Sequence, residues 1–215
     1  MATDSLLLLA WLSPGFPTGA FACSHGLEYA IEAGDVVNET TSCAWIEDLL
    51  AHGAGWTDAV LLRHAHAGAR DPDRLALLAE LGRAAVPARE RRTETIDLGT
   101  AFAAAALPWA PPPLPPAPPY PVALGALAGA HGVDVDATVA GHLQSFAAML
   151  ISASVRLVPL GQSAGLRVLA ALGATIGAVA EASRGAGLDD LGGAAFRSDL
   201  AAMRHETQYT RLFRT

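Results

Sequence analysis

The chain has 215 residues, a hydrophobic content of 52%, a charged content of 16% and a formal net charge of −7. A negative balance disfavours binding to nucleic acid, because neutralising phosphates requires a basic surface. All 14 basic residues are Arg. The chain therefore lacks the Lys that a P-loop or a Schiff base to pyridoxal phosphate requires.

The location of the protein is predicted from what the sequence lacks. No window reaches the roughly 18–20 uninterrupted apolar residues of a membrane span. Asp4 and the absence of a basic residue before Leu6 are unlike a secretory signal. Cys23 and Cys43 form neither a disulfide framework nor a zinc pattern. We expect a cytoplasmic protein without membrane association, whose surplus apolar surface is covered by oligomer or partner interfaces.

Long Ala- and Leu-rich runs, with hardly any alternation of Val, Ile and Thr, predict an all-α fold. Asp71 and Pro72 fit the N-cap and first position of one helix. Residues 188–215 are less regular. Helices are expected in chain order at about 4–12, from Thr18 or Gly19 to Ala33, from Asn38 or Thr40 through Leu50, over 57–67, from Asp71, after Pro87, and at 122–130, 134–158 and 162–184.

Residues 108–121 hold nine of the fourteen prolines. Such a segment cannot be helical, and polyproline II structure or disorder is expected. A stiff loop between two helical halves is favoured over a proline-rich ligand for another domain.

The helix expected over 134–158 is apolar on nearly every side, with a narrow polar strip of Ser145, Ser152 and Arg156. A helix with so little polar surface is expected at the centre of a fold. We therefore predict one domain, residues 1–215, built as a bundle of about eight to ten helices around this element.

His25, Glu28 and Glu32 would form a polar stripe on a helix over 20–33, with Cys23 on the opposite, packed side. That separation excludes Cys23 and His25 as joint ligands of one metal. The favoured interpretation is a solvated helix face. The alternative is a transient cation site or a pore lining, for which three such groups are weak metal candidates.

The remaining motifs support no enzyme class. His64 and His66 point apart on a helix and cannot clamp one metal. His205-Glu206 is followed by Tyr209 where a zinc protease needs a second His. No serine-hydrolase elbow or phosphate-binding loop is present. The run at 89–92 is expected to be a solvated charged face.

The C-terminal segment, about 197–215, has four Arg against Asp199 and Glu206. Aromatic and apolar residues alternate there with Arg, a composition typical of interface hot spots. Docking to a partner and fraying are both open for this segment.

Three segments resemble the urease accessory protein F (UreF) family over nearly the whole chain. They are Ser13-Pro-x-x-Pro-x-Gly-x-Phe-x-x-Ser-x-Gly-Leu-Glu28, Arg156-Leu-Val-Pro-Leu-Gly-Gln162, and Met203-Arg-His-Glu-x-x-Tyr-x-Arg-Leu-Phe-Arg214. Their order, their separation and the helical character between them also match.

The resemblance implies an all-helical homodimer without catalysis of its own. It would join a nickel-binding GTPase (the G type) to the accessory protein that contacts urease (the D/H type). The assembly would deliver nickel to apo-urease in a GTP-dependent way. No cofactor would be bound stably, and nickel would be in transit at most. A direct nickel carrier or conduit using His25, Glu28 and Glu32 is the alternative, and an unrecognised helical active site is a third interpretation.

The resemblance also implies where partners bind. The segment Met203–Arg214 would order against the D/H-type protein, the turn 156–162 would contribute to the core or face the GTPase, and the segment 13–29 would lie near the dimer and GTPase contacts. The partner-binding residues would be Ser24, His25, Glu28, Arg156, Gln162, Arg204, His205, Glu206, Tyr209, Arg211, Leu212, Phe213 and Arg214.

The sequence departs from the family pattern in three places. Cys23 stands where the family often has Tyr. After Gln162 the family usually continues with an acidic or polar residue, Gly and Gln, whereas this chain continues with Ser163-Ala164-Gly165-Leu166. The run 108–121 is longer and richer in proline than expected.

Overall fold

A computed structural model describes residues 2–215, and the side chains of residues 4–215. The described residues form ten α-helices and four short 3₁₀ turns, without a strand, so the all-α prediction is confirmed. The α-helices are α1 (Ala2–Trp11), α2 (Leu27–Glu32), α3 (Glu39–His52), α4 (Ala54–Ala67), α5 (Pro72–Ala84), α6 (Arg89–Ala105), α7 (Tyr120–Ala130), α8 (Val135–Leu157), α9 (Gln162–Ala182) and α10 (Phe196–His205). The 3₁₀ turns are η1 (Ala20–Ala22), η2 (Leu107–Trp109), η3 (Ser183–Gly185) and η4 (Leu188–Asp190).

Two helix starts follow the predicted capping chemistry. The Asp71 carboxylate accepts a hydrogen bond from the amide of Arg74 at 3.0 Å, and Pro72 opens α5. Asn38 caps α3 by accepting from the amide of Thr41, while the Thr41 hydroxyl accepts from the amide of Asn38. Each cap satisfies backbone donors that a helix end leaves free.

The helix expected from Thr18 or Gly19 to Ala33 is broken, and this expectation is wrong. After η1 the chain is extended at Cys23, and His25 and Gly26 have positive φ angles of 60° and 79°. Left-handed residues cannot continue a right-handed helix. Consequently α2 begins only at Leu27, and His25 does not lie on the same helix as Glu28 and Glu32.

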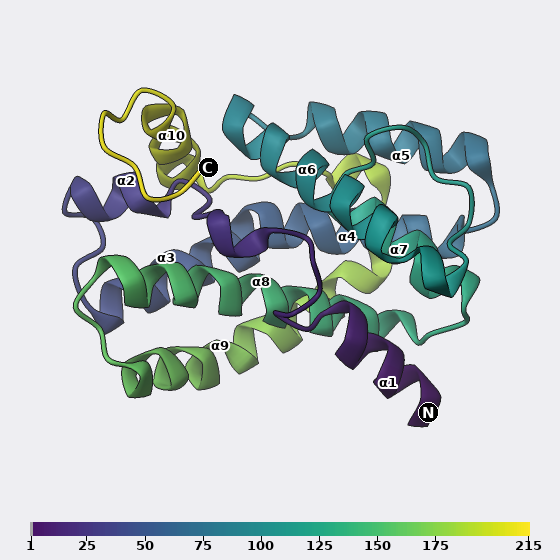
Figure 1. Ribbon diagram of the computed structural model, residues 1–215, viewed down its shortest axis with the longest axis horizontal. Coiled ribbons are helices and arrows are strands. Elements are labelled where there is room, and N and C mark those ends of the chain that lie inside the picture. The colour runs from purple at the N-terminus through teal and green to yellow at the C-terminus, as the bar shows by residue number, and fades with distance from the viewer. Residues whose placement is uncertain (1) are drawn as a thin grey trace.

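The main hydrophobic core takes buried side chains from nearly all of the helices, α8 among them. α8 packs against α9, α4, α2, α3 and α7. In Figure 1, α3 and α8 cross the middle of the molecule, α9 lies below them, and α5, α6 and α10 lie above. The helix α1 extends away at the lower right, far from α10.

The helices α4 and α7 approach each other unusually closely. A Cβ atom added at Gly125 would lie 2.4 Å from the carbonyl oxygen of Leu62, and one at Gly129 would lie 2.2 Å from that of His66. Both distances are too short for any side chain. The two glycines, spaced by four residues, therefore let the backbones of α4 and α7 make contact.

The proline-rich segment is a loop that packs on the body of the protein between η2 and α7. Its ends are more helical than expected, because Pro108 and Trp109 belong to η2 and Pro121 to α7. The Trp109 ring meets Trp11 edge to face at 6.3 Å, and the Trp109 carbonyl accepts from the His131 ring at 2.6 Å.

By length and composition alone, α8 and the run Gln162–Gly185 are apolar enough to cross a membrane. Half of the most apolar window of α8 is buried inside the bundle. A core helix of a globular fold has the same properties, and α8 packs as one.

Candidate partner-docking site

The last ten residues, 206–215, form an irregular segment of turns and bends that packs along the turn 22–28; we call it the terminal segment. The amide of Arg214 donates to the carbonyl of Ala22 at 2.8 Å. The amide and the hydroxyl of Ser24 both donate to the carbonyl of Thr215, at 2.7 and 2.8 Å. Residues 188–215 were expected to be less regular. They include the helix α10 and a segment that main-chain hydrogen bonds hold against the body of the protein.

Glu28 holds the terminal segment by its main chain. One carboxylate oxygen accepts from the amide of Leu212 at 2.7 Å, and the other accepts from the amide of Phe213 at 3.0 Å. The side chain is only 7% exposed. The expected solvated helix face is therefore wrong for Glu28, since its carboxylate replaces water with buried amide donors.

His205 ends α10 and is completely buried. Its Nδ1 lies 2.6 Å from Glu90 of α6, and its Nε2 lies 3.2 Å from Glu28 of α2. Arg211 of the terminal segment also reaches Glu90, at 2.6 Å. One histidine thus joins two helices, and Glu90 links it to the terminal segment.

The charge run 89–92 does not form the solvated face that was expected. Glu90 points inward to His205, and Arg91 is buried with its nearest carboxylate, that of Asp199, at 3.9 Å. Burial lowers the pKa of Arg91, an effect that Glu94 and Asp199 oppose. Only Arg89 and Arg92 of this run are exposed.

His25 pairs with Glu94, a residue that the sequence did not single out. The His25 Nδ1 atom lies 2.7 Å from one Glu94 oxygen, and the Thr215 hydroxyl donates to the other at 2.6 Å. Burial, followed by the charge of Arg91, lowers the pKa of His25. Although burial opposes it, the contacts of Glu94 with His25, Arg91 and Thr215 lower its pKa. A neutral His25 therefore donates to an ionised Glu94.

A signal for Glu94 was present in the sequence. Glu90 and Glu94 are one turn apart on α6, and like charges at that spacing destabilise an isolated helix. Such a pair indicates partners elsewhere in the fold. The structure supplies them as His205 and Arg211 for Glu90, and His25 and Thr215 for Glu94.

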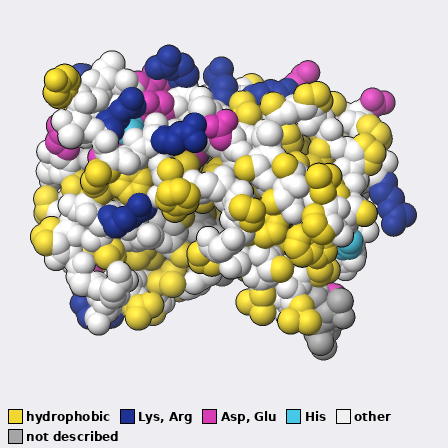
Figure 2. Space-filling model, in the orientation of Figure 1, with side chains coloured by type: hydrophobic (Ala, Val, Ile, Leu, Met, Phe, Trp, Pro, Cys, Tyr) yellow, Lys and Arg dark blue, Asp and Glu magenta, His cyan; other side chains and the backbone are white. Residues whose placement is uncertain are grey.

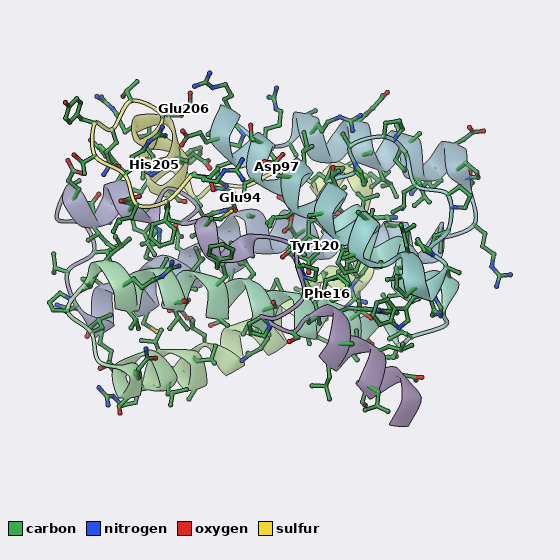
Figure 3. The ribbon with its side chains drawn as sticks, viewed as in Figure 1. Phe16, Glu94, Asp97, Tyr120, His205 and Glu206 are labelled. Atoms are coloured by element: carbon green, nitrogen blue, oxygen red, sulfur yellow. The ribbon has the colours of Figure 1, made fainter. Side chains whose placement is uncertain are left out.

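Arg156, near the end of α8, joins the same region. Its guanidinium donates to the carbonyl of Phe21 at 2.9 Å and lies 4.2 Å from the centre of the Phe213 ring. Gln162 is exposed at the start of α9. Figure 3 shows His205 and Glu94 in the same part of the molecule, with Tyr120 and Phe16 farther toward α7 and α1.

The three weak metal candidates have three separate partners. His25 bonds to Glu94, Glu28 bonds to the terminal segment, and Glu32 accepts from Gln208 at the surface. Among the described residues there is no group of three or more His, Cys, Asp or Glu that could hold a metal ion. The structure therefore does not bring these three side chains together as one site.

Cys23 is buried beneath the terminal segment. Burial, followed by the nearby charge of Glu94, raises the pKa of its thiol to about 12. Since the thiolate is the form that binds metals and attacks electrophiles, this cysteine is a packed, inert thiol at neutral pH. Its placement on a packed side agrees with the sequence interpretation, although the local backbone is not helical.

The outer side of this region exposes large apolar groups. Tyr209 is fully exposed and Leu212 is 76% exposed. On α10, Phe196, Leu200 and Met203 lie on one face and are 69%, 60% and 42% exposed. An exposed apolar face of this size on an ordered helix is typical of a binding surface.

This α10 face borders a groove of about 1600 Å³ between the loop 12–21, α8 and α10. Exposed arginines lie in the terminal segment or beside it, namely Arg89, Arg156, Arg204, Arg211 and Arg214. Figure 2 shows dark blue arginine side chains gathered over the upper left of the molecule, beside yellow apolar groups. Apolar residues interleaved with Arg are the preferred composition of interface centres.

Comparison with known proteins identifies the family of the chain. The model of the UreF family matches residues 36–173. The chain belongs to the UreF family. The urease accessory protein UreF of Cereibacter sphaeroides (strain ATCC 17029 / ATH 2.4.9) is 53% identical over 222 residues, covering 100% of both chains. The protein of the same name from Methylobacterium sp. (strain 4-46) is 48% identical over 221 residues, covering 98% of this chain and 88% of the relative.

The UreF match and the candidate site overlap only in part. The family model includes the Arg156–Gln162 turn and α6 with Glu90 and Glu94, but it stops before α10. The UreF relatives extend over the whole chain and so include the 22–28 turn and the terminal segment as well. The 22–28 turn and the terminal segment are far apart in the sequence, and the fold brings them into contact.

Proposed function

We propose that this UreF-family protein is a non-enzymatic urease maturation factor. It scaffolds and regulates the nickel-binding accessory GTPase of the G type, and couples it to the urease-binding accessory protein of the D/H type. Nickel passes to apo-urease through this assembly as cargo, with no cofactor bound stably to the chain. The protein works in the cytoplasm as a homodimer. The family membership supports a role in urease maturation.

The observation that carries the proposal is the exposed apolar face beside the terminal segment. Glu28 holds the main chain of this segment, while the side chains of Tyr209 and Leu212, and that of Leu200 on α10, are exposed. A surface ordered before binding loses less conformational entropy when a partner docks. We assign this face to the D/H-type partner.

The GTPase would occupy the adjoining surface near Arg156 and Gln162. The Arg156 guanidinium donates hydrogen bonds to the carbonyls of Ser152 and Phe21, yet it is exposed and pairs with no carboxylate among the described residues. A cation in that condition favours an acidic partner surface.

The test is a binding measurement between the purified chain and each partner. Truncating Tyr209, Leu200 and Leu212 to Ala should weaken the D/H-type complex by at least roughly 30-fold, since the loss of even one central apolar anchor costs about 2 kcal/mol at an interface. Leu77→Ala on α5 is the control, because Leu77 is also exposed but lies on another helix. Unchanged affinity in the triple variant, or no complex with either partner, would refute the assignment.

Point variants test the surface more cleanly than deletion of residues 203–215. Deletion would also remove His205, leave the buried Glu28 without its donors and take the Thr215 donor from Glu94, which costs stability for reasons unrelated to docking.

A further inference from the structure

We propose that the outer face of α9 forms the contact between the two copies of the homodimer, with the two α9 helices antiparallel and the two-fold axis at Ala174. The inference rests on the homodimer of the proposed function. It goes beyond that function by assigning the interface and the pairing of its residues.

The inner side of α9 packs on its own chain, while its outer side is uncovered. α9 contacts α8 and α3, and its contribution to the core comes from Val168, Leu172, Ile176 and Val179. In Figure 1, α9 forms the lower left edge of the molecule. Only 39% of the most apolar window in the run Gln162–Gly185 is buried. An apolar helix with this much uncovered surface is typical of an interface.

The centre of the outer face is a row of small residues with opposite charges near its ends. At about 100° per residue, the exposed residues that lie within about 40° of Ala174 are Ser163, Arg167, Ala170, Ala178 and Glu181. The side chains of Arg167 and Glu181 are 62% and 67% exposed. Over the roughly 21 Å between these two residues, the row carries only the methyl groups of three alanines. Side chains this small let the backbones of two helices approach closely.

The charges identify the partner as a second copy. In an antiparallel helix pair, residues equally far from the two-fold axis face each other. Arg167 lies seven positions before Ala174, and Glu181 lies seven positions after it. Arg167 of each copy therefore faces Glu181 of the other, which gives two identical ion pairs. A surface that is its own complement about a two-fold axis fits a symmetric homodimer, whereas contact with a different protein needs no such symmetry.

Both charged groups can make this second contact while keeping their contacts within the chain. Arg167 donates to Glu39 from Nε and from one terminal nitrogen, and its other terminal nitrogen still carries donors. Glu181 accepts from Arg184 at 2.8 Å, and a carboxylate can accept further hydrogen bonds. Exposed ion pairs contribute little affinity but favour one orientation over another. Burial of the apolar face would hold the copies together, and the ion pairs would set the antiparallel register.

The proposed contact differs from the position that the family resemblance implies, which is near the segment 13–29. Phe21 of that segment is 77% exposed and belongs to η1, which contacts α8. An arginine in place of Phe21 therefore tests the competing surface.

The first experiment measures the oligomeric state of the full chain by sedimentation velocity over a range of concentrations. Ala174→Arg places two long cations against each other on the axis, so the dissociation constant of the dimer should rise by at least about 100-fold. Ala104→Arg is the matched control, because Ala104 is exposed on α6, which lies on the other side of α8 from α9 in Figure 1. This control and Phe21→Arg should both remain dimeric. A dimer that survives Ala174→Arg, or that is lost in Phe21→Arg alone, would overturn the inference.

The second experiment exchanges the two charges. Arg167→Glu and Glu181→Arg each set like charges against each other twice across the interface, and each should weaken the dimer roughly tenfold. The double variant restores opposite charges between the copies and should recover the parent affinity. Within each chain it does the reverse, because Glu39 and Arg184 then face like charges. A double variant weaker than both single variants would therefore show an effect within the chain and overturn the pairing.

The same measurements separate this inference from the proposed function. A parent chain that is monomeric at every concentration would refute the homodimer, and the inference with it. A parent dimer that Ala174→Arg leaves intact would refute the inference alone. Vesicles of phosphatidylcholine and phosphatidylglycerol test the other apolar occupant: a monomeric parent that binds them, while Ala174→Arg does not, would assign the α9 face to a lipid surface and overturn the inference.

Discussion

At the residue scale, the most consequential feature is the left-handed turn at His25 and Gly26. It ends one helical stretch and starts another, and it turns the His25 ring toward Glu94. It also brings the backbone against α10, since a Cβ atom on Gly26 would lie 2.7 Å from the main chain of Ala202. The site is built on this contact, because α10 carries His205.

Replacing Gly26 by Ala should therefore destabilise the protein by about 2–4 kcal/mol, combining left-handed strain with a backbone clash. Gly34→Ala is the control, because Gly34 has a similar φ of 82° but open space around it. That variant should lose only about 1–2 kcal/mol. Chemical denaturation of both variants measures the difference, and equal losses would mean that α10 can move aside without cost.

At the element scale, α10 and α6 determine which charges are buried. The charge run of α6 lies against α10 and the terminal segment, so Glu90 and Arg91 turn inward. Helical periodicity alone does not reveal that these two charged side chains face inward, because the buried side of a helix depends on which other elements pack against it. The α4–α7 pair shows the opposite case, in which two glycines in the sequence prescribe a close contact.

The substitution Gly125→Ala should separate α4 from α7 and cost about 1–3 kcal/mol, since a buried methyl group would overlap the Leu62 carbonyl. The matched change Gly177→Ala in α9 has no atom within 4 Å of the new methyl group. Removing a helix-interior glycine there should stabilise the protein by about 0.5–1 kcal/mol. Thermal unfolding of both variants checks the opposite signs, and a stabilised Gly125→Ala would contradict the close packing.

At the scale of the whole molecule, buried ionisable groups should make stability depend on pH. The pKa of His25 is lowered from 6.5 by burial and by Arg91, so the folded state binds fewer protons than the unfolded state below about pH 6.5. Stability from this residue is present above that pH and is lost as pH falls. The lowered pKa of Glu94 acts in the same direction below about pH 4.5.

The expected result is a melting temperature that falls more steeply in the parent chain than in His25→Gln between about pH 7 and pH 5, by a few degrees. Gln can still donate to Glu94 but does not titrate. Differential scanning calorimetry across this range is the measurement, and parallel profiles would exclude His25 as the source.

The sequence by itself determined the all-α class, the capped starts of α3 and α5, the long helices α8 and α9, and the family, because these depend on local propensity, on spacing and on motifs. It also placed Cys23 on a packed side. Only the tertiary structure decided that His25 and Glu28 are buried, that Glu90 pairs with His205, and that Glu94 belongs to the site. Glu28, Glu90 and Glu94 are satisfied by α10 and the terminal segment, more than 100 residues away in the chain, and His25 is satisfied by Glu94. A polar pattern shows that partners are needed, but the long-range packing determines whether water or another part of the protein supplies them.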